Sequence, residues 1–218
     1  GKSLDVAQDP RVVEQLGRIR DRWKKVDEAA GRLSDNEQSL TTLAKGLDGI
    51  NQGNNTILEL SQQAAQQIGQ GGGTLRDLDF ANQLAVLSQR IAKNANALAS
   101  GEQIDPEVAF LLGKDTGTFR DVLNGLLKGS DTMRIAAVRN EDARSTLGEL
   151  AKRFAGYEQG VNAILQNMQR LTVAKQSARD INAESEPLLK ESTDLAAAFE
   201  GGGLERTLTF WLAIAFAT

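Results

Sequence analysis

Apolar residues recur along most of the chain at alternating spacings of three and four, the pattern of helices with one buried face. The pattern predicts an all-α protein. Polar or glycine-rich segments interrupt it and mark the helix ends. The expected helices cover about residues 10–33, 40–68, 74–100, 105–128, 141–168 and 171–199. The first apolar seam consists of Leu16, Ile19, Trp23, Val26, Ala30 and Leu33.

A second regularity spans more than one helix: residues 10–73 resemble residues 141–203, and the two stretches align without any gap. An offset of 131 residues carries Leu16 onto Leu147 and Trp23 onto Phe154. A fixed period of this size indicates a duplicated supersecondary unit. Further pairs at the same offset are Ile19 with Leu150, Arg22 with Arg153, Val26 with Tyr157, Leu33 with Ile164, Ile50 with Ile181 and Ser61 with Ser192.

The duplication predicts three segments. Residues 1–73 would be the second half of a first module, with two helices. Residues 74–203 would be a complete up-down-up-down four-helix bundle, because four long helices with short turns favour that topology. Residues 204–218 would be a juxtamembrane segment and the start of a transmembrane helix. Glycine triplets at 71–73 and 201–203 stand at both junctions, where they permit a bend or serve as plain linkers.

The last twelve residues, TLTFWLAIAFAT, carry no charge and follow Arg206. A bilayer-spanning helix needs about 20 apolar residues, so this stretch alone is too short. Trp211 is of a type enriched at membrane interfaces. We favour the front of a transmembrane helix, and the alternative is a helix packed in the protein core.

Composition narrows the possible chemistry. The chain has no histidine and no cysteine, which excludes disulfides, imidazole or thiolate metal sites, and histidine-based catalytic triads. The 25 basic and 29 acidic residues are dispersed and give a net charge of −4, so no basic patch indicates nucleic acid binding. We therefore expect no enzymatic activity, no catalytic residue, no metal and no cofactor.

The densest distinctive segment is residues 84–93. Within it, the sequence LSQR at 87–90, followed by IAK at 91–93, resembles the signature in the first helix of PilJ-type sensor modules. The tandem arrangement, Ile181-Asn182 and the following Leu188-Leu189 are also similar to that family. The resemblance covers most of the chain. It implies a periplasmic sensor region between two inner-membrane helices of a chemoreceptor-like transducer of type IV pili, with a methyl-accepting signalling domain elsewhere in that protein.

The same segment supplies the candidate ligand-binding residues Arg90, Gln89 and Lys93. Related nitrate sensors carry an anion-binding arginine five residues before the position of Arg90, and Ala85 stands there in this chain. The main positive donor of such an anion site is therefore missing. The alternative role for Arg90 is structural, with its stem packed along the bundle and its guanidinium in water or paired with a carboxylate.

Two further sets of residues are candidates. Ser185 and Ser192 occupy the apolar seam of the last helix, as Asn54 and Ser61 do in the first copy. They would mark a signalling helix whose packing against its neighbours must stay weak enough to change. The alternative is that their side chains hydrogen-bond to carbonyl groups of their own helix, or fix the register in which helices pair. The aromatic residues Trp23, Phe154 and Tyr157 are expected at packing or interface positions.

We interpret the sequence as the periplasmic sensor domain of a methyl-accepting chemotaxis-type transducer that controls twitching motility and signals by helix displacement. The resemblance implies a homodimer in the inner membrane, the type IV pilin subunit as a partner, and a cytoplasmic histidine kinase reached through the signalling domain. Self-association through the helix pair of residues 10–70 is expected, because its apolar seams need a cover. The alternative is a structural or adhesive helical protein without a signalling role.

Overall fold

The computed structural model describes the backbone of residues 10–215 and the side chains of residues 10–199, and every regular element in this range is an α-helix. The helices are α2 (Pro10–Asp35), α3 (Glu37–Gln70), α4 (Leu75–Ser100), α5 (Pro106–Lys128), α6 (Glu141–Gln166) and α7 (Met168–Ala215). The predicted all-α class and the predicted helical bundle are confirmed.

Local chemistry explains where the helices begin and end. Thr74 caps α4 in a capping box, in which its hydroxyl accepts from the backbone of Asp77 while the Asp77 carboxylate accepts from the backbone of Thr74. Asp105 caps α5 ahead of Pro106, and Asn140 caps α6 through its side chain. These capping residues fix the entry of each helix close to the positions expected from the sequence.

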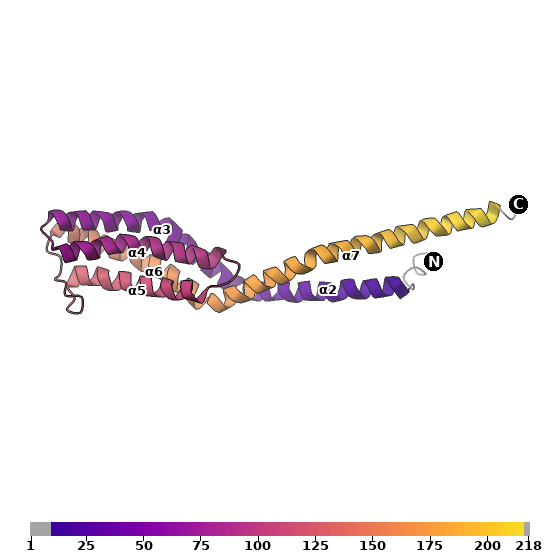
Figure 1. Cartoon of the computed structure of the whole chain (residues 1–218), viewed down its shortest axis with the longest axis horizontal. Coiled ribbons are helices and arrows are strands. Elements are labelled where there is room, and N and C mark those ends of the chain that lie inside the picture. The colour runs from indigo at the N-terminus through magenta and orange to yellow at the C-terminus, as the bar shows by residue number, and fades with distance from the viewer. Residues whose placement is uncertain (1–9, 216–218) are drawn as a thin grey trace. The chain divides into compact units, whose positions relative to one another are not determined.

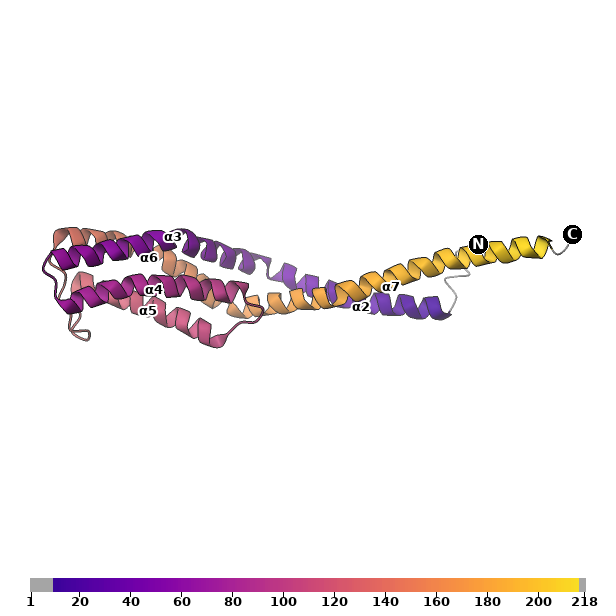
Figure 2. The same ribbon diagram turned by 45° about the horizontal axis from the view of Figure 1, so that its top comes forward.

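The chain divides into two compact units, each described by itself. Unit 2 covers residues 37–172 and is a four-helix bundle of α3, α4, α5 and α6 (Figure 1; Figure 2). Leucine, isoleucine and alanine side chains from all four helices form one continuous core. The inward residues expected for α4 are all buried, namely Leu84, Leu87, Ile91, Ala95 and Leu98.

The bundle contains a different set of helices from the expected set. The expected bundle comprised residues 74–203, whereas in the structure α3 takes the place assigned to the helix of residues 171–199. The turn at residues 71–73 reverses the chain and lays α3 against α4, with Gly72 at a φ of 77° that favours glycine. No such turn follows α6. Helical hydrogen bonding continues from Asn167 into the first turn of α7.

The duplication predicted from the sequence is visible in hydrogen bonds. Asn36 separates α2 from α3, and its side chain donates to the carbonyl of Arg32 at 2.7 Å. Asn167 separates α6 from α7, and its side chain donates to the carbonyl of Ala163 at 2.8 Å. Both asparagines also donate their backbone N–H to the residue three before. Each copy is thus a pair of consecutive helices joined at one asparagine, and the two asparagines are 131 residues apart.

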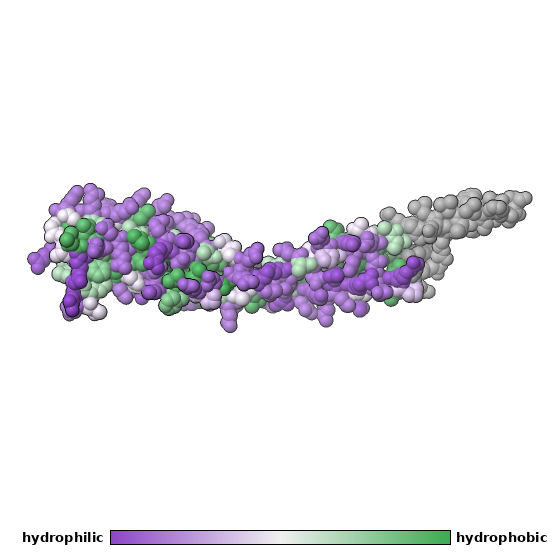
Figure 3. Space-filling model, viewed as in Figure 1, coloured by the Kyte–Doolittle hydropathy of each residue, from purple (hydrophilic) through white to green (hydrophobic). Residues whose placement is uncertain are grey.

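Unit 1 consists of residues 1–36 and 173–218, and in its described part α2 lies antiparallel to α7. Polar side chains cover most of the face of this pair that Figure 3 shows. The backbone of α7 remains helical through residues 201–203, where the expected bundle ended. Of the helices in the described range, none is both long enough and apolar enough to cross a membrane. The side chains of the expected transmembrane start, residues 207–218, lie outside the described residues.

Candidate functional site

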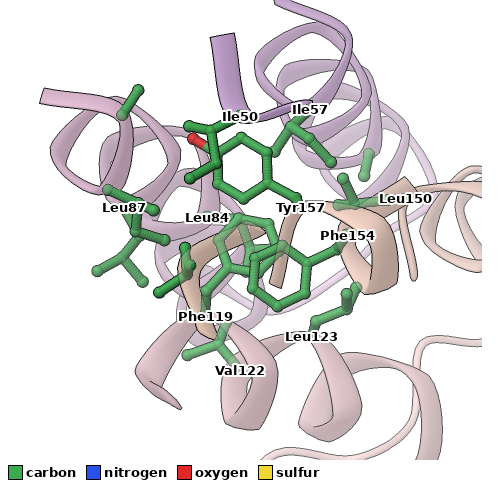
Figure 4. Packing of buried hydrophobic residues seen from close by; sticks show 14 of the residues in the cluster. Ile50, Ile57, Leu84, Leu87, Phe119, Val122, Leu123, Leu150, Phe154 and Tyr157 are labelled. Carbon is green, nitrogen blue, oxygen red and sulfur yellow. The ribbon is translucent and has the colours of Figure 1, made fainter. Parts of the chain in front are cut away.

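The centre of unit 2 is aromatic. Phe154 of α6 stacks on Phe119 of α5 with ring centroids 4.1 Å apart, and Tyr157 follows one turn later at 6.0 Å from Phe154. Figure 4 shows these rings between isoleucines of α3 and leucines of α4. Phe154 and Tyr157 are each only 3% exposed. Both side chains are therefore buried in the core of unit 2.

Tyr157 carries a polar group into this core. Its hydroxyl lies 3.2 Å from the carbonyl oxygen of Ser88 on α4 and 3.4 Å from Oδ1 of Asn54 on α3. Burial raises the pKa of the tyrosine hydroxyl, because the charged phenolate is disfavoured away from water. The hydroxyl therefore remains a neutral donor, and through it one residue of α6 contacts both α3 and α4.

The three ligand candidates do not converge on one point of the bundle. Gln89 donates toward Asn54 of α3 at 3.4 Å, while Arg90 Nη2 lies 2.9 Å from Oδ1 of Asp115 on α5. Lys93 is exposed. Arg90 thus adopts the structural role that the sequence left open, because it is paired with a carboxylate. Binding of a ligand by these residues remains a prediction.

Asp115 was not among the candidates, although it is the acidic side chain most deeply placed in the core of unit 2 among the described residues. It is 3% exposed, and its Oδ2 has no hydrogen-bond partner within the described part of the chain. The sequence contained a signal for this burial. Asp115 lies three residues after Leu112 and four before Phe119, on the apolar stripe of α5.

In unit 1, α2 and α7 are joined by charged groups. Arg22 lies between Glu184 and Glu191, with nitrogen–oxygen distances of 2.6 and 3.0 Å, and Lys25 lies 2.9 Å from Glu184. The hydrogen bond from Lys25, followed by that from Arg22, lowers the pKa of Glu184. We call these four residues the ionic seam. Sequence reasoning missed it because Arg22 and Glu184 are 162 residues apart.

The ionic seam extends along the helix pair in both directions. Arg32 Nη2 lies 2.8 Å from Asp180, and Arg32 Nε donates to the hydroxyl of the buried Ser177 at 3.1 Å. At the other end, Gln15 donates to the backbone carbonyl of Glu191 at 3.0 Å. The contact between α2 and α7 is therefore largely polar.

The remaining candidates lie at the surface of unit 1. Ser185 and Ser192 are exposed, and the Ser185 hydroxyl donates to the carbonyl of Ile181 at 2.6 Å, which is local bonding within the helix. They are therefore not on a buried seam as expected, because no described helix covers that side of α7. Trp23 is 58% exposed, so it has no packing partner comparable to that of Phe154.

The described side chains offer no arrangement for metal binding. Among residues 10–199, no histidine, cysteine, aspartate or glutamate residues gather in groups of three or more that could hold an ion. The polar groups described above connect helices to one another.

The chain is similar to parts of longer known proteins. No protein-family model matches the chain. The chain is 28% identical to PilJ of Pseudomonas aeruginosa over 131 residues, which are 60% of this chain and 19% of that protein. It is 25% identical to the methyl-accepting chemotaxis protein AlkN of Alcanivorax borkumensis over 188 residues, which are 86% of this chain and 28% of that protein. The chain thus spans less than a third of these relatives. The chain is therefore similar to segments of PilJ and of a methyl-accepting chemotaxis protein.

Proposed function

We propose that this chain is the periplasmic sensor region of an inner-membrane transducer that controls type IV pilus twitching motility. The observation that carries the proposal is the likeness to a methyl-accepting chemotaxis relative along 86% of the chain, together with the likeness to PilJ. The all-helical structure of the described residues is compatible with a sensor that responds by helix movement.

The proposed mechanism is mechanical and centres on α7. This helix begins in unit 2 with Met168–Thr172 and continues in unit 1 from Val173 onward, so its residues belong to both units. A ligand or protein partner that prefers one packing of the helices would shift the population toward that packing. Small helix displacements of this kind are a common form of signalling transition. The ionic seam suits such movement, because partly exposed charge pairs hold two helices together less firmly than a packed apolar core does.

The partners follow from the same resemblance. We infer a homodimer, the type IV pilin subunit as an extracytoplasmic partner, and a histidine kinase controlled from the cytoplasmic side. Thermal unfolding of the chain with purified pilin, or with small anions, provides a direct binding assay. A partner that binds only the folded state raises the unfolding temperature as its concentration rises. Absence of any shift with pilin at saturating concentration would remove pilin from the proposal.

The signalling role is tested by bridging α2 to α7 in the intact transducer. The chain has no cysteine, so Gln15→Cys together with Glu191→Cys gives a defined pair for a short bis-maleimide linker. We expect the bridged receptor to lose its twitching response, because α7 can no longer move against α2. Each single cysteine variant, treated in the same way, should respond normally. A bridged receptor that responds like the unbridged one would contradict the mechanism.

A further inference from the structure

Unit 1 exposes an apolar face that a folded protein ordinarily covers. On α2, Val13, Leu16 and Trp23 are 53%, 41% and 58% exposed, at helical spacings that place them along one side of the helix. On α7, Leu189 and Phe199 are 69% and 36% exposed. We call these five residues the uncovered face. Exposed aromatic and aliphatic groups in such number mark an interaction site.

The duplication shows what such a face packs against. The equivalents of Leu16 and Trp23 in unit 2 are Leu147 and Phe154, which are 0% and 3% exposed. The cover is the helical hairpin of α4 and α5, and Phe119 of α5 stacks directly on Phe154. One pattern of residues is therefore buried under a hairpin in one copy and exposed in the other.

The second helix of each copy repeats this contrast. Phe199 of α7 corresponds to Ile68 of α3, which is 1% exposed, and Ser192 corresponds to Ser61, which is 0% exposed. The helix α3 packs on α4, whereas Phe199 and Ser192, on the equivalent side of α7, are exposed. The exposure of Ser185 and Ser192 has the same explanation. Their equivalents Asn54 and Ser61 lie on the helix that α4 covers.

We propose that the uncovered face is the docking site for a two-helix hairpin of the α4–α5 type, supplied by the part of the same polypeptide that comes before Pro10. In the second copy, this hairpin directly precedes the first helix of the copy, α6. Asp9 occupies the repeat position of Asn140, the residue that caps α6 after the hairpin. The homologous transducers are also more than three times as long as the part that this chain matches.

The docked hairpin would complete a second four-helix bundle from α2, α7 and two apolar-striped helices. A second copy of this chain is the competing occupant, since two uncovered faces could also pack on each other. The observations favour the hairpin, because the face of unit 2 equivalent to this one is occupied by a hairpin of the same polypeptide. The proposal concerns assembly and does not depend on what the receptor senses.

The test is photo-crosslinking in the intact protein. The photoreactive residue p-benzoyl-phenylalanine replaces Trp23, and mass spectrometry identifies the peptide that it captures after irradiation. We expect capture of a peptide from the segment before Pro10 of the same molecule. Capture of α2 or α7 from a second copy would overturn the proposal. An irradiated protein with no crosslink at all would also overturn it.

Two positions in unit 2 act as matched controls in the same experiment. The photoreactive residue at Phe154, the repeat equivalent of Trp23, should capture the α5 peptide that contains Phe119. At Phe110, which is 67% exposed on α5, it should capture no partner within the chain. A crosslink at Phe154 with none at Trp23 shows that the chemistry works and that the uncovered face is empty, which counts against the proposal.

Discussion

The two units place duplicated helices in opposite surroundings. Phe154 lies in a stacked aromatic core, whereas its equivalent Trp23 is 58% exposed on α2. The local sequence pattern around both residues is the same, and both lie on long helices. Heptad-like spacing therefore predicts that a face is suitable for burial, but the number of helices available decides whether it is buried.

The contacts between paired helices differ as well. In unit 1 the seam is charged, with Glu184 and Glu191 of α7 on either side of Arg22. The equivalents of the two glutamates in unit 2 are Gly53 and Leu60 of α3. There the ring of Tyr157 packs so closely that a Cβ on Gly53 would lie 3.5 Å from it. Since partly exposed ion pairs stabilise less than buried apolar contacts, unit 2 should be the more stable unit.

The largest expected effect tests this difference at equivalent positions. Phe154→Ala should lower the free energy of unfolding of unit 2 by about 3–5 kcal/mol, because it removes a buried ring from a packed core. Trp23→Ala should change the stability of this chain by less than about 0.5 kcal/mol, since the ring is largely exposed. Denaturant unfolding followed by circular dichroism measures both. Equal losses of stability for the two variants would contradict the proposed difference between the two units.

A smaller effect is expected where α3 and α6 touch through their backbones. A Cβ on Gly160 would lie 2.6 Å from the carbonyl oxygen of Gly46, so Gly160→Ala should cost about 1–3 kcal/mol as the helices are forced apart. Gly156→Ala on the same helix is the control, because no atom lies within 4 Å of its added Cβ. This control substitution should raise the free energy of unfolding by about 0.5–1 kcal/mol, because alanine favours a helix more than glycine does. Opposite shifts of the unfolding temperature for the two variants would support this backbone contact.

The hydroxyl of Tyr157 should contribute less to the stability of unit 2 than either of these contacts. Tyr157→Phe keeps the ring in the core but removes the hydrogen bonds toward Ser88 and Asn54, which costs about 0.5–1.5 kcal/mol. Denaturant unfolding of the variant measures this loss. The same variant should exchange the amide protons of α4 faster, if the hydroxyl holds that helix to α6. A variant as stable as the parent would show that the bond adds nothing to packing.

The smallest expected effect is in the ionic seam and depends on pH. The pKa of Glu184 lies below its ordinary value of 4.5 in the folded chain, so its contribution to stability is complete above that value. The contribution is lost as the pH falls through the folded pKa. Glu184→Gln should therefore lower the unfolding temperature at pH 7, and the gap to the parent should close toward pH 3.

The control for this variant comes from unit 2. Arg153, the equivalent of Arg22, pairs with Glu149 on its own helix, and both side chains are substantially exposed. Glu149→Gln should therefore leave the unfolding temperature nearly unchanged at either pH. A gap between Glu184→Gln and the parent that stays constant from pH 7 to pH 3 would show that pairing of the carboxylate is not the cause.

The sequence was sufficient for the elements and for much of the core. Helical spacing located Leu84, Leu87 and Ile91 on the inner side of α4, and the expected helix start at about residue 141 agrees with the start of α6. These features depend on residues that are close to one another in the sequence, so a single sequence is enough to predict them. The offset of 131 residues was equally visible, and the equivalent bonds of Asn36 and Asn167 give it a structural counterpart.

The pairing of helices could not be obtained in this way. An apolar seam shows that a helix has a buried side, but many helices can cover it equally well, so α3 was assigned to the wrong group. Ion pairs such as Arg22 with Glu184 leave no periodic trace in the sequence. The candidate binding residues Gln89 and Arg90 are adjacent in sequence, yet successive residues of a helix point about 100° apart, and they contact different helices.

The pairing of α2 with α7 has a consequence for the order in which the protein folds during synthesis. Gln15 and Glu191 are 176 residues apart, whereas α4 follows α3 across a short turn. Contacts between distant residues form late, because the intervening chain must first be made and ordered. A ribosome that has not yet reached Asp180 has already produced every helix of unit 2, while the charged side of α2 still lacks the α7 carboxylates that pair with it.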